Sequence, residues 1–284
     1  MDKIAKGKPV ADNISKNLMK DIGVLHNGGF YPRLAIVRVG KDPNNLAYER
    51  GILSRFKKLG LATEVKEFKE NISEEIFVKE LEAINKDENI HGILILRPLP
   101  KQLNENNIQY KINPNKDIDC LNPLNEAKLL TGDKTGFLPC TPAALMELLK
   151  YYKIKIQGKN AVVVGRSMVV GKPAALLLLN ENATVTICHS KTENMREITK
   201  SADILVVAIG RANFIDASYV SKNTVVIDVG INVDSEGNLC GDVDLENVIN
   251  KVASITPVPG GVGAVTTTIL AKQLIKACKI QNNL

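Results

Sequence analysis

Residues 161–179 read AVVVGRSMVVGKPAALLLL. A β-branched strand leads into a loop with Gly165, Ser167 and Gly171, and an apolar helix follows with Pro173 near its first turn. A dinucleotide-binding fold needs small residues at such a turn, because backbone N–H groups and the helix dipole must reach a pyrophosphate. The stretch therefore predicts a Rossmann-like unit.

The match to the GxGxxG pattern is imperfect. Ser167 stands at the second glycine position, and Gly171 lies one residue later than the third. The pattern alone is weak, and an ordinary strand-to-helix turn is the alternative. The strand and the helix on either side favour the nucleotide site.

The end of the next strand bears on the choice between NAD and NADP. NAD-binding folds place Asp or Glu about 20 residues after the glycine loop, where it holds the ribose 2′-OH. Here the segment reads CHSKT, residues 188–192, with Ser190 and Lys191 but no carboxylate. Arg166 in the loop adds another cation. A hydroxyl flanked by cations suits a 2′-phosphate, so NADP is favoured over NAD. The alternatives are a solvated loop charge for Lys191 and a packed strand-end side chain for His189.

Strand-like and helix-like segments alternate along the chain, which is typical of parallel sheets with crossover helices. The expected fold class is therefore α/β with two domains. Strand patterns occupy residues 33–40, 62–68, 91–99, 159–165, 183–189, 203–209 and 224–230. Helical patterns occupy residues 11–25, 48–60, 73–87, 143–154, 172–182, 192–201 and 264–280.

Residues 112–142 are rich in Pro, Asn and Gly, so they are expected to form a loop that carries function. The final helix, 264–280, has an apolar stripe that fits packing against the first half of the chain. We therefore predict a discontinuous first domain, residues 1–143 plus 264–284, and a nucleotide-binding domain of residues 144–263.

Composition narrows the class of protein. The 284 residues carry 37 Lys and Arg against 31 Asp and Glu, a net charge of +6 that favours small anions but lacks a clustered basic stripe for nucleic acid. Neither a membrane span nor a signal peptide is evident, so a cytoplasmic protein is expected. The five cysteines are scattered without a CxxC pair, which predicts reduced thiols and no metal site.

Seven motifs are distributed along the chain: PNKDIDCLNP, PCTP, VVVGRSMVVGKP, ATVTICHSKT, VIDVGIN, GDVD and ITPVPGGVG. In their order and spacing, the chain resembles the bifunctional methylenetetrahydrofolate dehydrogenase/cyclohydrolase family. The resemblance covers nearly the whole chain.

The resemblance implies a folate-binding α/β domain and a Rossmann-like NADP domain flanking a cleft, homodimerisation, and 5,10-methylenetetrahydrofolate as substrate. It places Asp119 at the pterin and the ring of Tyr48 along the folate; for Asp119 the alternative is a turn-capping aspartate. It also implies a set of cofactor contacts: Gly165, Arg166, Ser167, Ser190 and Ile231, the last beside the nicotinamide. Gly171 is predicted as a cofactor residue from the glycine loop itself.

Two departures from the family's pattern bear on the chemistry. The family's GILVQLPLP reads GILILRPLP here, so Leu96 replaces a glutamine, and YERGI places Ile52 at the family's lysine position. Cys120 replaces a glycine, and GGVGAVT replaces GGVGPMT. The resemblance assigns proton transfer during hydrolysis of the methenyl product to that lysine, tuned by the glutamine. We therefore expect a methylenetetrahydrofolate dehydrogenase with weak or absent cyclohydrolase activity.

The other cations of the 48–60 helix do not replace the lysine. Arg55 is a poor base because it stays protonated, and Lys57 and Lys58 turn off the face of Tyr48, so all are expected to face solvent. Three alternatives remain open: an intact bifunctional enzyme, a noncatalytic NADP- or folate-binding protein, and a dehydrogenase for an unrelated small substrate.

Overall fold

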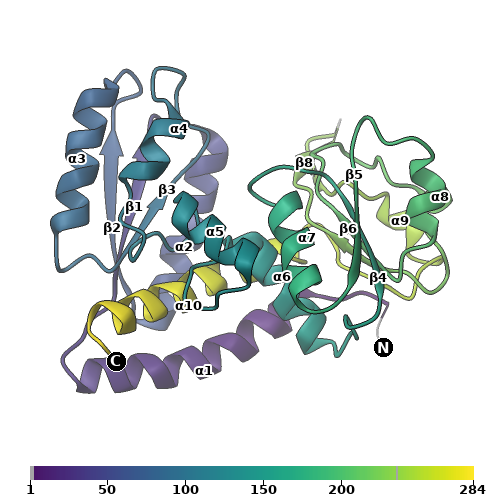
Figure 1. Ribbon diagram of the computed structural model, residues 1–284, viewed down its shortest axis with the longest axis horizontal. Helices are drawn as coiled ribbons and strands as arrows, with labels where there is room; N and C mark the ends of the chain where they lie inside the picture. The colour runs from purple at the N-terminus through teal and green to yellow at the C-terminus, as the bar shows by residue number, and fades with distance from the viewer. Residues whose placement is uncertain (1–2, 235) are drawn as a thin grey trace. The chain divides into compact units, whose positions relative to one another are not determined.

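The computed structural model describes residues 3–234 and 236–284 and divides the chain into two units (Figure 1). The three-stranded unit comprises Ile14–Cys140 and Thr267–Leu284. The five-stranded unit comprises the chain up to Asn13 and Thr141–Thr266. The predicted α/β class, with parallel sheets in two domains, is confirmed.

The start of the chain differs from the predicted boundaries, which placed residues 1–143 together. Ile4 bridges to Ile255, the N–H of Ala5 donates to the carbonyl of Ile255 at 2.8 Å, and the N–H of Gly7 donates to the carbonyl of Gly260 at 2.8 Å. These bonds attach the first described residues to the five-stranded unit. They join positions far apart in the chain, which a local pattern does not reveal.

The sheet of the five-stranded unit is parallel throughout, in the order β10-β7-β6-β4-β5. Its central strands β4 and β6 are apolar at nearly every position because both faces are covered. The strands are β4 (Asn160–Val164), β5 (Thr184–Cys188), β6 (Ile204–Val207), β7 (Val225–Asp228) and β10 (Ser254–Ile255). β10 was not predicted, because two residues are too short to show an alternation.

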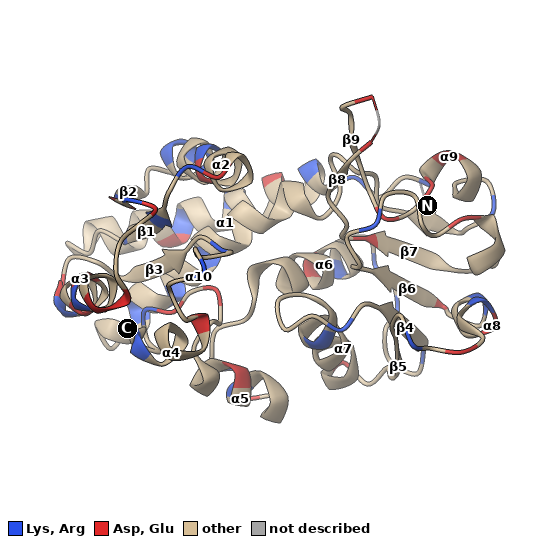
Figure 2. Cartoon of the chain, turned by 90° about the horizontal axis from the view of Figure 1, so that it is seen from above, with Lys and Arg blue, Asp and Glu red and all other residues tan. Residues whose placement is uncertain are grey.

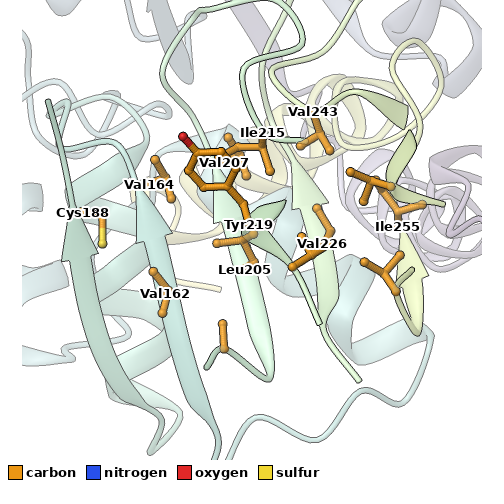
Figure 3. Packing of buried hydrophobic residues seen from close by; sticks show 14 residues of the cluster. Val162, Val164, Cys188, Leu205, Val207, Ile215, Tyr219, Val226, Val243 and Ile255 are labelled. Carbon is orange, nitrogen blue, oxygen red and sulfur yellow. The ribbon is translucent and has the colours of Figure 1, made fainter. Parts of the chain in front are cut away.

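One face of this sheet forms a close-packed apolar cluster (Figure 3). Alternate residues of neighbouring strands contribute to it, Val162 and Val164 from β4 and Leu205 and Val207 from β6. The helices α8 (Met195–Lys200) and α9 (Leu245–Val248) cover the cluster with partly buried apolar side chains. Helix α7 (Gly171–Asn180) packs against β4 and β5.

The three-stranded unit has the parallel order β2-β1-β3, with β1 (Arg33–Val39) in the middle, β2 (Ala62–Phe68) and β3 (Gly92–Ile95). Crossover helices α2 (Pro43–Leu59) and α3 (Glu74–Lys86) connect the strands. α3 buries Phe77, Leu81 and Ile84 in a cluster with apolar residues of β1 and β3.

Helix α2 contains the predicted 48–60 segment up to Leu59 and begins at Pro43, because the Asp42 side chain caps it and Pro43 fits its first turn. It buries one stripe that includes Glu49, Ile52 and Phe56. Lys57 and Lys58 are exposed, as predicted. The prediction for Arg55 was wrong: this side chain is half-buried and lies 3.5 Å from the Ser15 hydroxyl.

A buried ion pair ties α2 to the sheet. Arg38 of β1 donates from Nε to Glu49 at 2.7 Å, and its guanidinium lies 3.0 Å from Glu67 of β2. Arg38 and Glu49 are both buried. Loss of Arg38 would leave the buried Glu49 without its counter-charge, so this contact orients α2 on the sheet.

The prediction of a loop over residues 112–142 was wrong in part, because helix α5 (Pro123–Thr131) lies inside it. Asn122 caps the helix by accepting from the N–H of Leu124 at 2.9 Å, and Gly132 ends it with a φ of 72°. These Asn, Pro and Gly residues are helix boundaries as well as turn residues. Helix α6 (Cys140–Tyr151) begins at the end of the same segment.

The remaining elements are short except for two long helices, within which the unit boundaries at Asn13 and Thr266 fall. They are α1 (Gly7–Asn27), α4 (Glu105–Ile108), η1 (Gln109–Lys111), η2 (Ala217–Tyr219), β8 (Asn232–Val233), β9 (Leu239–Cys240) and α10 (Gly263–Gln281). α10 packs closely on β3, since a Cβ atom on Gly92 would lie 2.8 Å from Leu274.

Charges of both signs are mixed on helices α2, α3 and α8 (Figure 2). All five cysteines are free thiols, and only Cys240 among them is not buried. In the part of the chain that the structure describes, no helix is long and apolar enough to cross a membrane.

Asp117 organises the loop before α5. Its Oδ1 accepts from the N–H of Leu121 at 2.9 Å, and its Oδ2 accepts from the N–H of Asn122 and the side-chain amide of Asn125, each at 2.8 Å. Burial raises the pKa of the Asp117 carboxyl to about 6. The loop is thus held by a carboxyl whose ionisation costs stability.

The Asp117→Asn variant tests this pKa. Because the pKa is higher in the folded chain than in the unfolded one, the Asp117 contribution to stability is largest in acid and is lost as the pH rises through about 6. The unfolding free energy of the native chain minus that of the variant should fall by on the order of 2 kcal/mol between about pH 4 and pH 7.

Asp133→Asn is the control, measured by denaturant unfolding at each pH. A hydrogen bond from the N–H of Thr135 lowers the pKa of the exposed Asp133, so its contribution is lost as the pH falls. A difference for Asp117 that stays constant or rises with pH would contradict the assignment.

Candidate active site

The turn between β4 and α7 requires glycine at two positions. Gly165 has a φ of 127°, and a Cβ atom there would lie 2.2 Å from the carbonyl oxygen of Ala208. A Cβ atom on Gly171 would lie 2.3 Å from the carbonyl oxygen of Gly165. No side chain fits at these distances. The turn therefore presents a bare backbone surface, which is what close approach of a pyrophosphate requires.

Ser167 explains the departure from the GxGxxG pattern. Its hydroxyl accepts from the N–H of Val170 at 3.2 Å and from the N–H of Gly171 at 3.3 Å. A serine here closes the turn at the start of α7, which a glycine could not do. Ser167 and Arg166 are both exposed, so their side chains are accessible to a ligand.

Arg166 and Ser190 emerge at the same edge of the sheet. Val164 of β4 pairs with Cys188 of β5. Arg166 lies two positions after Val164, and Ser190 lies two positions after Cys188. The N–H of Gly165 donates to the carbonyl of Cys188 at 2.9 Å, which joins the two turns. Ser190 is exposed. The structure thus brings together the predicted contacts of the glycine loop and of the next strand.

His189 is used inside its own turn. Its ring Nδ1 accepts from the backbone N–H of Lys191 at 3.1 Å, and its backbone N–H donates to the Thr192 hydroxyl at 2.8 Å. These bonds agree with the structural alternative for His189. Lys191 itself is exposed beside Ser190.

Ile231 follows β7 and is 70% exposed, which is unusual for a large apolar side chain. Because β7 is parallel to β6 and β4, its carboxyl end lies at the same edge of the sheet as the glycine turn. Ligands of open α/β sheets bind at this edge. The position therefore fits an apolar contact with a ring system.

Asp242, for which the sequence predicted no role, gathers the loop after β6. Its carboxylate accepts from the N–H groups of Ile209 at 2.7 Å, Gly210 at 3.1 Å and Arg211 at 2.7 Å, and from the side-chain amide of Asn232 at 2.9 Å. Asp242 is fully buried. The GDVD motif was the only sequence signal for Asp242, and a motif does not show which N–H groups its carboxylate binds.

Asp228 holds the loop after β7 in the same way. Its carboxylate accepts from the N–H groups of Gly230 at 2.9 Å, Asp242 at 3.1 Å and Val243 at 3.0 Å. Burial raises the pKa of Asp228 to about 6. The two aspartates together determine where the backbone places Ile231.

In the three-stranded unit, Asp119 lies near Tyr48. The N–H of Cys140 donates to Asp119 Oδ1 at 2.8 Å, which orients the carboxylate. Burial raises the pKa of Asp119, and the charge of Arg97 acts in the opposite direction. Burial raises the pKa of Tyr48, and the neighbouring Asp119 raises it further.

Gln273 of α10 supports the segments on both sides of Asp119. Its side-chain amide donates to the carbonyls of Ile118, at 3.0 Å, and of Leu138, and its oxygen accepts from the N–H of Leu138 at 3.2 Å. This residue was not predicted, because a glutamine in an apolar-striped helix carries no local signal.

Ile52 and Leu96 are buried, with exposed fractions of 0% and 3%. Ile52 lies one helical turn after Tyr48 on α2, and the N–H of Leu96 extends the pairing of β3 by donating to the carbonyl of Val37 at 2.9 Å. Neither side chain can transfer a proton. These two positions are therefore apolar and shielded from water.

Cys120 occupies a left-handed backbone conformation, with a φ of 58°. This conformation costs a residue with a side chain roughly 1–2 kcal/mol and costs glycine almost nothing. It explains physically why a glycine suits this position. Across residues 3–234 and 236–284, no group of three or more His, Cys, Asp and Glu is arranged to hold a metal ion.

Two family models match the chain. The catalytic domain of tetrahydrofolate dehydrogenase/cyclohydrolase matches residues 5–119, and the NAD(P)-binding domain of the same family matches residues 139–282. The chain belongs to the tetrahydrofolate dehydrogenase/cyclohydrolase family. The predicted resemblance and the predicted nicotinamide cofactor domain are thereby confirmed.

Relatives in this family match along the full chain. The "Bifunctional protein FolD" of Alkaliphilus oremlandii (strain OhILAs) is 59% identical over 284 residues, which is 100% of each chain. The bifunctional FolD enzyme of Campylobacter jejuni has a solved structure that is 37% identical, with a TM-score of 0.96 and 99% of each chain covered. The Trypanosoma brucei enzyme, solved with NADP cofactor and an inhibitor, is 34% identical, with a TM-score of 0.94. The match covers 99% of this chain and 98% of the Trypanosoma brucei chain.

The Asp242→Ala variant tests the role of the buried carboxylate. Truncation leaves three backbone N–H groups and the Asn232 amide without their acceptor, so the unfolding free energy should fall by on the order of 3 kcal/mol. Denaturant unfolding followed by circular dichroism measures it.

Asp244→Ala is the matched control two residues away. Asp244 caps α9 by accepting from the backbone N–H of Asn247 at 3.3 Å and from the side-chain amide of the same residue, so its loss should cost about 1 kcal/mol. Equal effects of the two variants would refute the special role of Asp242.

Proposed function

We propose that the chain is an NADP-dependent 5,10-methylenetetrahydrofolate dehydrogenase in which cyclohydrolase activity is weak or absent. Family membership supports the dehydrogenase part of this proposal. The observation that carries the second part is the burial of apolar Ile52 and Leu96, at the positions where the family's pattern has lysine and glutamine.

The folate would bind in the three-stranded unit through Asp119. The N–H of Cys140 already orients this carboxylate, so its remaining acceptor capacity can meet the amino group and ring N–H of the pterin as two parallel bonds. Tyr48, next to Asp119, would pack its ring along the folate. Both residues act by positioning, which is the main requirement of this reaction.

When bound, the oxidised nicotinamide accepts the hydride that leaves the methylene carbon of the substrate. The chain's own part is to orient and to exclude water. Ile231 would contact the nicotinamide ring through its exposed side chain, and Gly165, Ser167 and Gly171 would admit the pyrophosphate.

NADP is proposed over NAD because of Arg166 and Ser190. Both are exposed at adjacent strand ends, where a guanidinium and a hydroxyl suit a 2′-phosphate. The Trypanosoma brucei relative was solved with NADP. Homodimerisation and a cytoplasmic location remain predictions from the sequence.

An assay of nicotinamide reduction tests the dehydrogenase proposal. With 5,10-methylenetetrahydrofolate, absorbance of the reduced cofactor should rise faster with NADP than with NAD. Asp119→Asn should lower kcat/KM about 100-fold, because two hydrogen bonds to a charged group are disturbed. Asp133→Asn, an exposed aspartate of the same unit, should leave the rate unchanged.

The possible results separate the alternatives. No reduction with either cofactor would eliminate the dehydrogenase and favour a noncatalytic binding protein. A strong preference for NAD would contradict the roles of Arg166 and Ser190.

The cyclohydrolase part follows from proton transfer. Attack of water on the methenyl carbon needs a group that takes a proton from water and a group that gives one to the ring nitrogen, and a positioned acid or base contributes about 10² to 10⁴ in rate. Ile52 and Leu96 supply neither. The hydrolytic step would then run close to its spontaneous rate.

The competing function is the intact bifunctional enzyme. The Alkaliphilus oremlandii relative, 59% identical, is described as bifunctional, which favours this alternative. It requires that another residue carry out the proton transfer. Arg55, a permanent cation half-buried near Ser15, is a poor candidate.

Hydrolysis of isolated methenyltetrahydrofolate decides between the two. The native chain should hydrolyse it little above the spontaneous rate, whereas an Ile52→Lys, Leu96→Gln double variant should gain about 100-fold. An Ile52→Met, Leu96→Met double variant controls for repacking and should gain nothing. Native cyclohydrolase turnover comparable to the dehydrogenase rate would establish the bifunctional enzyme instead.

A further inference from the structure

An arginine lies beside the carboxylate proposed to bind the pterin. Arg97 follows the carboxyl end of β3, and the segment that carries Asp119 runs parallel to this strand: Ile93 bridges to Asp117, and the N–H of Ile93 donates to the carbonyl of Lys116 at 2.7 Å. Both segments advance in the same direction, so Asp119 reaches the end of β3 where Arg97 emerges. The charge of Arg97 accordingly lowers the pKa of Asp119 against the effect of burial.

The backbone on both sides of Arg97 is held in place. The N–H of Leu96 donates to the carbonyl of Val37 at 2.9 Å, and the N–H of Leu99 donates to the Glu105 carboxylate at 2.8 Å. The Arg97 side chain is half-buried. Among the described residues it has no hydrogen-bond or ion-pair partner, although its charge reaches Asp119. A cation on a held backbone, whose side-chain donors have no partner among the described residues, thus lies near the oriented Asp119 carboxylate.

The chemistry of a pterin edge matches this pair. The edge presents an amino group, a ring N–H and then a carbonyl oxygen, which is two donors followed by one acceptor. A carboxylate accepts from the two donors and offers nothing to the carbonyl. A guanidinium carries five N–H donors and no acceptor. A leucine, which the family's GILVQLPLP pattern has at this position, provides no donor.

We infer that Arg97 is a specificity-determining residue that donates a hydrogen bond to the carbonyl oxygen at position 4 of the pterin, while Asp119 accepts from the amino group and the ring N–H. This inference rests on the proposed function of the same site. Arg97 then selects folates with an oxo group at position 4. An amino group at that position directs N–H donors against the guanidinium.

Binding of folic acid and of aminopterin, its 4-amino analogue, tests the inference without catalysis. The ligands differ in the group at position 4, and the exchange also removes the proton from the neighbouring ring nitrogen, so aminopterin loses one donor to Asp119 in the native chain and in every Arg97 variant alike. Isothermal titration calorimetry at pH 8 measures both dissociation constants. The native chain should bind folic acid more tightly than aminopterin. Arg97→Leu should weaken folic acid about 10- to 100-fold, the loss expected for a hydrogen bond from a charged donor, and should weaken aminopterin much less. The preference for the 4-oxo ligand should therefore shrink by about the same 10- to 100-fold factor, and the part that remains is due to the ring N–H at Asp119.

Two further variants keep the test decisive. Lys101→Leu removes one exposed positive charge from the same loop and should keep both affinities. Arg97→Gln keeps an amide donor without the charge and should keep part of the preference for folic acid. If circular dichroism shows that Arg97→Leu does not fold, Arg97→Gln is the variant that tests the inference.

The remaining outcomes overturn the inference in distinguishable ways. Equal weakening of both ligands by the Arg97 variants means that Arg97 only maintains Asp119, so the proposed contact is absent while the folate site stands. Failure of the native chain to bind either ligand removes the folate site itself, and the proposed function with it.

Discussion

Buried aspartates that accept backbone N–H groups hold the loops of both candidate sites. Asp117 does so in the three-stranded unit, and Asp228 and Asp242 do so in the five-stranded unit. Burying an isolated carboxylate costs several kcal/mol, and a loop that leaves the sheet has N–H groups that also need partners. The loop N–H groups supply the hydrogen bonds that the buried carboxylate needs, and the carboxylate oxygens accept from N–H groups that would otherwise have no partner. The loops are therefore set by the positions of the carboxylates and not by the turn residues alone.

The two units meet different chemical demands. The nucleotide turn requires residues without side chains, since the surrounding backbone leaves no room for a Cβ atom at Gly165 or Gly171. The proposed folate site depends on which polar groups are kept. Asp119 retains its hydrogen-bonded orientation, whereas Ile52 and Leu96 are apolar and buried. In the proposed function, Ile52 and Leu96 together replace a polar pair, which avoids an unsatisfied buried group that would cost roughly 1–3 kcal/mol.

Much of the fold was predictable because its signals are local. The β-branched runs of β4, β6 and β7 indicate buried parallel strands, and the glycine turn indicates the nucleotide edge. Helix α5 was missed because its Asn122, Pro123 and Gly132 boundaries were interpreted as loop residues. Strand β10 was missed because the pairing of Ser254 and Ile255 with β7 is decided by a neighbour distant in the chain.

The sequence by itself determined the α/β class, the strand–glycine turn–helix unit and the family, because all three depend on residue types at short, regular spacing. Only the tertiary structure decided which groups meet. Asp242 binds the N–H groups of residues 209–211, more than thirty positions earlier in the chain, and Arg97 lies near Asp119 because two segments run side by side. Such contacts depend on chain folding over long separations, and no local pattern encodes their partners.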